Sequence, residues 1–147
     1  MATSSTHNSA DTTAWANLIE NAQVLPHTDS TRMIIERWFQ LAHNRTLIAN
    51  ACGVNPADVT IRCVEASAPF ICLRVEKPGK ISKPVPDKTL IIVAIGQLYP
   101  GNGMFTKVNL SSGEHVILSG NENQIFTGKL KGGGMGIILR LKFKPKW

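Results

Sequence analysis

The sequence predicts an α+β fold, with N-terminal helices followed by an antiparallel β-sandwich or a jelly-roll-like barrel. Between residues 30 and 52, apolar side chains recur at close to helical spacing, which is typical of an amphipathic helix. Beyond Gly53 the pattern changes to short apolar or alternating runs separated by Gly, Pro, Asn and Ser, which indicate strands joined by turns. No helical pattern lies between the later runs, so a parallel Rossmann-type sheet is disfavoured.

The chain begins with a polar segment. Residues 1–12 are mainly Ser, Thr, Asn and Ala, and they predict a flexible arm that becomes ordered only when a partner binds it. Residues 13–147 are predicted to form a single globular domain, because this length is sufficient to bury one core. We expect this domain to be helical over residues 13–53 and β-rich over residues 54–147.

Two helices are expected in the helical part. A short one over residues 13–24 should end before Pro26. A long one should be capped by Asp29 or Ser30 and should stop at Gly53, since glycine readily adopts the left-handed conformation that ends helices. The apolar stripe of the long helix consists of Ile34, Trp38, Leu41, Ile48 and Cys52.

A β-hairpin is expected to open the β-rich part. Residues 59–65 and 70–76 are its two predicted strands, and residues 66–69 (Ala-Ser-Ala-Pro) are its loop. In this register Cys63 lies opposite Cys72, an arrangement that permits a disulfide under oxidising conditions. Buried free thiols are the preferred alternative.

The region after residue 76 is predicted to be a basic loop followed by more strands. Residues 77–88 hold three prolines and four lysines, which favours an irregular surface loop. Residues 89–98 are almost continuously apolar and predict a strand buried on both faces. Further strands are expected over residues 104–110, 115–118, 124–130 and 136–143.

The last of these strands alternates strictly between apolar and basic residues from residue 139 onward. This period of two predicts one face against the core and the other in solvent. The face predicted to lie in solvent carries only positive charge, from Arg140, Lys142 and Lys144.

The formal net charge of +6 is concentrated in the second half of the chain. Residues 1–73 hold four basic and six acidic side chains, whereas residues 74–147 hold twelve and four. This asymmetry predicts a basic surface that faces nucleic acid or an acidic neighbouring subunit. The competing interpretation is that the lysines protect strand edges and maintain solubility. The predicted contact residues are Lys77, Lys80, Lys83, Lys88, Lys129, Lys131, Arg140, Lys142, Lys144 and Lys146.

Base stacking has few candidates in this sequence. Aromatic residues make up 6% of the chain, and a single-strand binder commonly stacks bases on such side chains. No nucleic-acid-binding motif accompanies them. The candidates for base stacking in the β-rich part are Tyr99, Phe105, Phe126, Phe143 and Trp147.

Catalytic and metal-binding patterns are weak. The cysteines Cys52, Cys63 and Cys72 lack the close pairing that zinc sites show, and we expect neither a metal nor a cofactor. The glycine run over residues 132–136 leads into a strand and not a helix, so a turn or bulge is preferred to a phosphate loop, with weak anion binding kept open. An acid/base pair of Glu114 and His115 would require a cleft around it.

Together these features favour a non-enzymatic structural or assembly subunit that self-associates, as part of a virion or other multi-subunit particle. The alternative is a nucleic-acid-binding protein that contacts phosphates with its basic half. A small enzyme or ligand binder with a site near His115 is a third hypothesis. The polar N-terminus lacks the pattern of a signal peptide, and no run is long enough to span a membrane, so we expect cytoplasmic synthesis.

Overall fold

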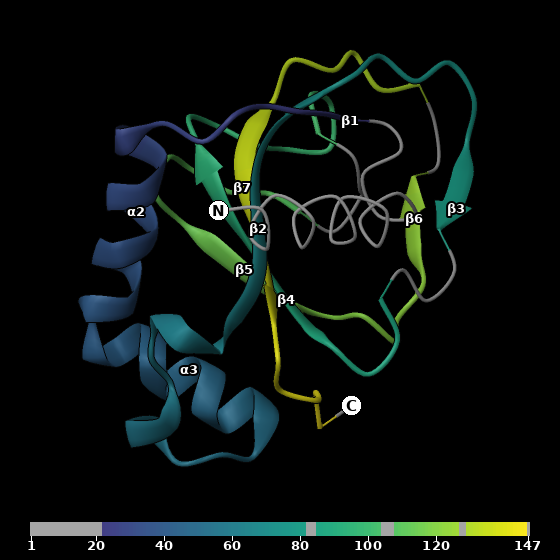
Figure 1. Ribbon diagram of the computed structural model, residues 1–147. Coiled ribbons are helices and arrows are strands. Elements are labelled where there is room, and N and C mark those ends of the chain that lie inside the picture. Colours follow the sequence, from purple (N-terminus) through teal and green to yellow (C-terminus); the bar gives the residue numbers. More distant parts are fainter. Residues whose placement is uncertain (1–21, 82–84, 104–107, 127–128, 147) are drawn as a thin grey trace, which may run out of the picture.

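The computed structural model describes residues 22–81, 85–103, 108–126 and 129–146. An antiparallel sheet with the strand order β1-β2-β7-β4-β5 lies between two helices and a two-stranded sheet, β3-β6 (Figure 1). The α+β class is therefore confirmed. The described strands of the large sheet leave it open at β1 and β5 and form no closed barrel. The strands are β1 Ala22–Val24, β2 Val64–Cys72, β3 Gly79–Ile81, β4 Thr89–Ile95, β5 His115–Ser119, β6 Gln124–Phe126 and β7 Met135–Leu141.

Two helices, α2 Asp29–Gln40 and α3 Ala42–Cys52, occupy the range in which one long helix was expected. The prediction of a single continuous helix was therefore wrong. The backbone of Leu41 between the two helices is extended. Side chains of α3 donate hydrogen bonds to backbone carbonyl groups at the end of α2. Asn44 Nδ2 donates to the Trp38 carbonyl at 3.0 Å, and an Arg45 guanidinium nitrogen donates to the Phe39 carbonyl at 2.7 Å.

The helix ends follow local capping chemistry. The N-cap of α2 is Thr28 and not Asp29 or Ser30, because the Thr28 hydroxyl accepts from the Thr31 amide while the Thr31 hydroxyl accepts from the Thr28 amide. Gly53 ends α3 in the left-handed conformation, as expected. Two 3-10 turns, η1 Pro56–Asp58 and η2 Ile61–Cys63, then lead to β2.

The short helix expected over residues 13–24 is contradicted at its described end. Residues 22–24 form β1, an edge strand that pairs antiparallel with Phe70–Cys72 of β2. Tertiary pairing with β2 thus outweighs the local helical pattern. Residues 13–21 and the predicted arm lie outside the described residues.

The predicted hairpin over residues 59–76 is wrong, because β2 runs without interruption through the expected loop. Ala66 and Ala68 are buried. These small residues, which in the sequence suggested a turn, instead face the core. Pro69 fits because its missing amide lies on the β1 side, where its carbonyl accepts from the Leu25 amide at 2.8 Å.

The correction to β2 also removes the predicted placement of Cys63 opposite Cys72, which would have permitted a disulfide. Cys63 directly precedes β2 and Cys72 ends it, so they are about 30 Å apart along an extended strand. All three cysteines are free. Burial raises the pKa of Cys63 to about 11 and that of Cys72 to about 12, so both thiols stay protonated near neutral pH and are poor nucleophiles.

The basic C-terminal strand is central in the sheet, and its predicted solvent face is contradicted at Arg140, whose side chain is mostly buried, whereas Lys142 and Lys144 are exposed as predicted. β7 pairs with β2 on one side and with β4 on the other. Ile137, Ile138 and Leu139 are all fully buried, so both faces of the strand contact core. β4 is buried on both faces, as predicted.

The two faces of the large sheet carry separate apolar clusters. Trp38, Phe39 and Ile48 of the helices cover the face that bears Ile91 and Leu139. The opposite face is covered mainly by connecting segments. Its cluster includes Phe70, Val75, Leu90, Leu98, Leu130 and Ile138.

The lysine-rich segment is more regular than predicted. Residues 79–81 form β3, which pairs antiparallel with β6 although prolines flank it. β5 confirms the strand expected over residues 115–118. Residues 82–84, 104–107 and 127–128 lie outside the described residues, and with them lie Lys83 and part of two expected strands.

Acid should destabilise the protein through His115, which is half-buried beside Trp38. Burial lowers the pKa of this imidazole below 6.5, and the nearby His43 lowers the pKa further. The Glu114 carboxylate raises it, but by less. The unfolded chain therefore binds this proton more readily, so the free energy of unfolding should fall as the pH drops below about 6.5. Urea unfolding between pH 5 and 8 measures this dependence. His115→Gln should flatten it, and an unchanged slope in that variant would assign the effect to other groups.

Candidate interaction surfaces

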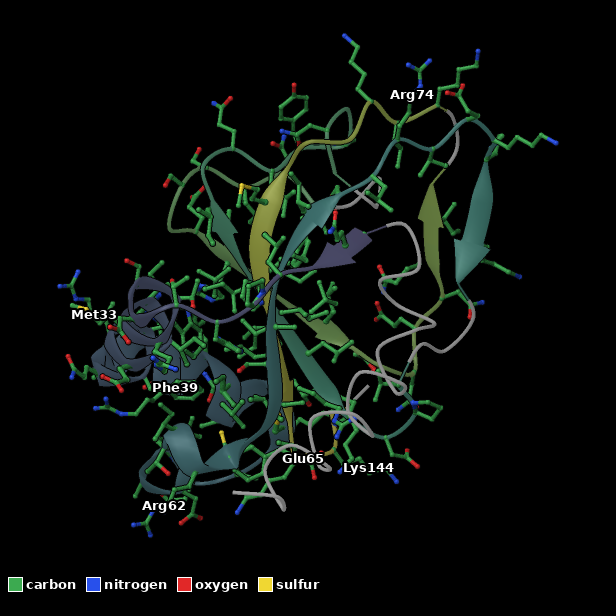
Figure 2. The ribbon with its side chains drawn as sticks, turned by 45° about the horizontal axis from the view of Figure 1, so that its top comes forward. Met33, Phe39, Arg62, Glu65, Arg74 and Lys144 are labelled. Atoms are coloured by element: carbon green, nitrogen blue, oxygen red, sulfur yellow. The ribbon has the colours of Figure 1, made fainter. Side chains whose placement is uncertain are left out.

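The predicted basic residues that the structure describes, which exclude Lys83, do not form one surface. They divide into two groups at opposite ends of β7, a strand of this length being about 20 Å long. Figure 2 shows the separation, since Arg74 lies at one end of the molecule while Glu65 and Lys144 lie at the other. We call the end that carries Arg74, Lys77, Lys129 and Lys131 the basic end.

The group away from the basic end is neutralised only in part. Lys88 Nζ lies 2.9 Å from Glu65 Oε1, and Arg140 Nε lies 3.3 Å from the same oxygen. The Arg140 side chain is only 12% exposed, so it is a structural ion-pair partner and not a solvent-facing contact. Lys144 pairs with Asp87 at 3.6 Å. Lys142 and Lys146 are exposed beyond the end of β7.

Cations at the basic end are exposed, and most carry no ion pair among the described residues. Lys77, Lys129 and Lys131 have none, and neither does Lys80 on nearby β3. Arg74, which the sequence analysis missed, pairs with Glu76. These unpaired lysines give this end of the molecule a surplus of positive charge, as Lys142 and Lys146, which have no ion pair among the described residues, do at the opposite end.

Backbone contacts hold the basic end together. Val75 and Leu130 form an antiparallel β-bridge, which places Lys131 opposite Arg74 and Lys129 opposite Glu76, the residue before Lys77. Gly132 permits the close approach of the two segments: its φ is +79°, and a Cβ there would lie 2.6 Å from the Leu73 carbonyl carbon. The positions of these lysines are thus set by the fold.

The glycine run is not a phosphate loop. The Gly133 amide donates to the Cys72 carbonyl at 2.8 Å, and the Gly134 amide donates to the Asn102 carbonyl at 2.9 Å. Because these two amides already donate hydrogen bonds to carbonyl groups of the chain, the amides are not available to bind an anion. The run serves to join the bridge to β7, in line with the preferred structural interpretation.

An exposed aromatic ring lies beside the basic lysines. Tyr99 is 42% exposed, and its ring lies against Gly101. The Lys131 amide donates to the Gly101 carbonyl at 2.9 Å, which connects the turn that holds Tyr99 to the lysine segment. Asn102 Oδ1 accepts from the Tyr99 amide at 2.9 Å and fixes the turn. Phe143 lies beyond the other end of β7.

A second surface is an open backbone edge along half of β2. β1 pairs with Phe70–Cys72 and the Leu25 amide bonds the Pro69 carbonyl, after which the chain leaves this edge at Pro26 toward α2. Residues 64–68 have no strand beside them on this side among the described residues. The Ser67 carbonyl points to this edge and accepts from His27 Nε2 at 2.9 Å, while the Ser67 amide has no partner in the described part of the chain.

The open edge faces a groove of about 640 Å³ between β2 and α2. Ile61 (45% exposed) and Val24 (38% exposed) give it apolar walls. Arg32 and Glu36 of α2 line it with charge. A second hollow of about 540 Å³ shares Glu36 and Ile61 with it, so the two adjoin.

His27 and Ser67 line the larger hollow, with His27 Nε2 3.1 Å from Ser67 Oγ, whereas the Glu114 and His115 pair predicted from the sequence lies elsewhere. Glu114 Oε1 accepts from the Ser111 amide at 2.6 Å, His115 contacts Trp38, and neither side chain lines the two hollows. In the described part of the chain, no three His, Cys, Asp or Glu side chains are grouped to hold a metal. Neither of these two hollows therefore gives Glu114 and His115 the cleft that acid/base chemistry needs.

Comparison with known proteins finds no matching protein family and no significant similarity to curated sequences or to solved structures. Among the described residues, no helix has the length and apolar character needed to cross a bilayer.

Proposed function

We propose that this chain is a non-enzymatic assembly subunit that self-associates, as part of a virion or other multi-subunit particle. The N-terminal arm of one copy lies in the groove of the next and adds a strand to the open half of β2. The observation that carries this proposal is the open edge at residues 64–68 beside a groove with apolar walls. Extended peptides commonly bind exposed sheet edges through main-chain hydrogen bonds.

The arm suits this groove in length and composition. Twenty-one residues precede Ala22, and they span up to about 70 Å when extended. Residues 1–12 carry mostly small polar side chains, which fit beside a backbone edge. Ala22 pairs with Cys72, at the end of β2 far from the groove. To reach the groove, the chain's own arm would have to reverse its direction at Ala22. The arm of a neighbouring copy can enter the groove without reversing.

The test is the mass of the nuclease-treated full chain by light scattering on a sizing column. We expect a defined oligomer, well above the 16.0 kDa of one chain. Ser67→Pro removes the amide that an added strand would bond and should release monomers. Ser67→Ala keeps the amide and should assemble normally.

A second pair of variants separates loss of docking from loss of folding. Ile61→Asp places a charge in the groove wall and should also release monomers. Met33, which is 47% exposed on α2 and does not line the groove, provides the matched control Met33→Asp. A monomeric wild-type chain contradicts self-association, and an oligomer that survives both groove variants contradicts this docking mode. Circular dichroism checks that each variant is folded.

A sandwich or jelly-roll-like architecture stays a prediction within this proposal.

A further inference from the structure

We propose that the basic end binds single-stranded nucleic acid, with Arg74, Lys77, Lys129 and Lys131 on phosphates and the Tyr99 ring stacked on a base. The inference is independent of the assembly proposal, because the basic end adjoins the Cys72 end of β2 whereas the groove adjoins the Val64 end. Each can fail without the other.

The charge at this end is suited to a phosphate chain. Three exposed lysines come from two segments that the Val75–Leu130 bridge holds side by side, and they have no acidic partner among the described residues. Glu76 is paired with Arg74 and is the acidic side chain closest to them in these segments. Unpaired lysines release counterions when they bind phosphates, and this release drives association with nucleic acid.

Tyr99 favours a single strand over an acidic peptide or a duplex. Its ring is supported by Gly101 on a turn that four hydrogen bonds stabilise, from the Tyr99, Asn102 and Gly103 amides and the Asn102 side chain. An exposed ring held in place loses little entropy when a base stacks on it. Bases in a duplex are already stacked, so only unpaired bases gain from this contact.

The test uses the full-length chain and a fluorescein-labelled 20-nucleotide single-stranded RNA of mixed sequence, with anisotropy measured from 50 to 200 mM KCl. The triple variant Lys77→Gln, Lys129→Gln, Lys131→Gln should reduce the slope of log K against log salt by about 2. At about 0.1 M salt this corresponds to about a hundredfold weaker binding. The matched control is Lys142→Gln, Lys144→Gln, Lys146→Gln, which removes the same charge at the opposite end and should keep the wild-type slope.

Stacking is tested separately from charge. Tyr99→Ala should weaken binding about tenfold at an unchanged salt slope, and Tyr99→Phe should restore it. Equal losses in the two lysine triples would overturn the proposal, because binding would then follow net charge alone. Equal affinity for a duplex of the same length, or for polyglutamate, would overturn the single-strand assignment in favour of a duplex or an acidic protein partner.

Discussion

Phe70→Ala should lower the free energy of unfolding by about 3–5 kcal/mol, because truncating a fully buried phenylalanine leaves a cavity in addition to the lost apolar contact. Phe70 lies in the cluster formed by Leu90, Ile92 and Ile138 on the sheet face away from the helices. Its ring fills the space beside Gly136, where a Cβ would lie 2.9 Å from the ring. Urea unfolding followed by circular dichroism measures the change.

Phe70→Leu is the control for this variant. Leucine keeps most of the buried apolar volume and should cost much less than alanine. Similar stabilities for wild type and Phe70→Ala would mean that this sheet face is not closely packed, since the penalty arises from a void that the surrounding residues do not fill.

Trp38→Ala should destabilise the protein by a similar amount, about 3–5 kcal/mol, by loosening the helix layer from the sheet. Trp38 is 5% exposed. Its ring makes edge contacts with Phe39 and with His115 of β5, each at 5.0 Å between centroids. Thermal unfolding by circular dichroism, with tryptophan-independent detection in the far ultraviolet, measures the loss.

Trp38→Phe should be much milder than Trp38→Ala. The Trp38 Nε1 group is buried without a hydrogen-bond partner among the described residues. Phenylalanine removes this unsatisfied donor, and the relief offsets part of the lost ring contact. If phenylalanine costs as much as alanine, the indole N–H contributes a contact that the described residues do not contain.

Strand positions with strong local signals were predictable from the sequence. The continuous apolar run of β4 required burial on both faces, and the structure confirms it. The segment 66–69 was misread because Ala, Ser and Pro are common in turns, whereas here Ala66 and Ala68 provide a flat surface for the core and Pro69 faces an edge. That distinction depends on the neighbouring strand, which a single sequence does not reveal.

The alternation in residues 139–144 was a correct signal except at Arg140. Leu139 and Leu141 are buried and Lys142 and Lys144 are exposed, but Glu65 reaches Arg140 from a distant part of the chain and pairs with it. Tyr99 carried a usable signal, since an aromatic residue next to a Pro-Gly-Asn-Gly turn tends to be exposed. Its position beside Lys131 depends on a tertiary hydrogen bond and could not be predicted from the spacing in sequence.

The central place of β7 has a consequence for how the protein is made. Its two partners, β2 and β4, are synthesised more than forty residues earlier, at positions 64–72 and 89–95. Until residues 135–141 leave the ribosome, these two strands lack the neighbour that joins them, and their apolar side chains remain accessible to other nascent chains. Pairings of such long sequence separation form slowly. The helices are formed by contacts between residues close in sequence and are synthesised before β2. They therefore provide the first surface against which the apolar strands of a growing chain can be buried.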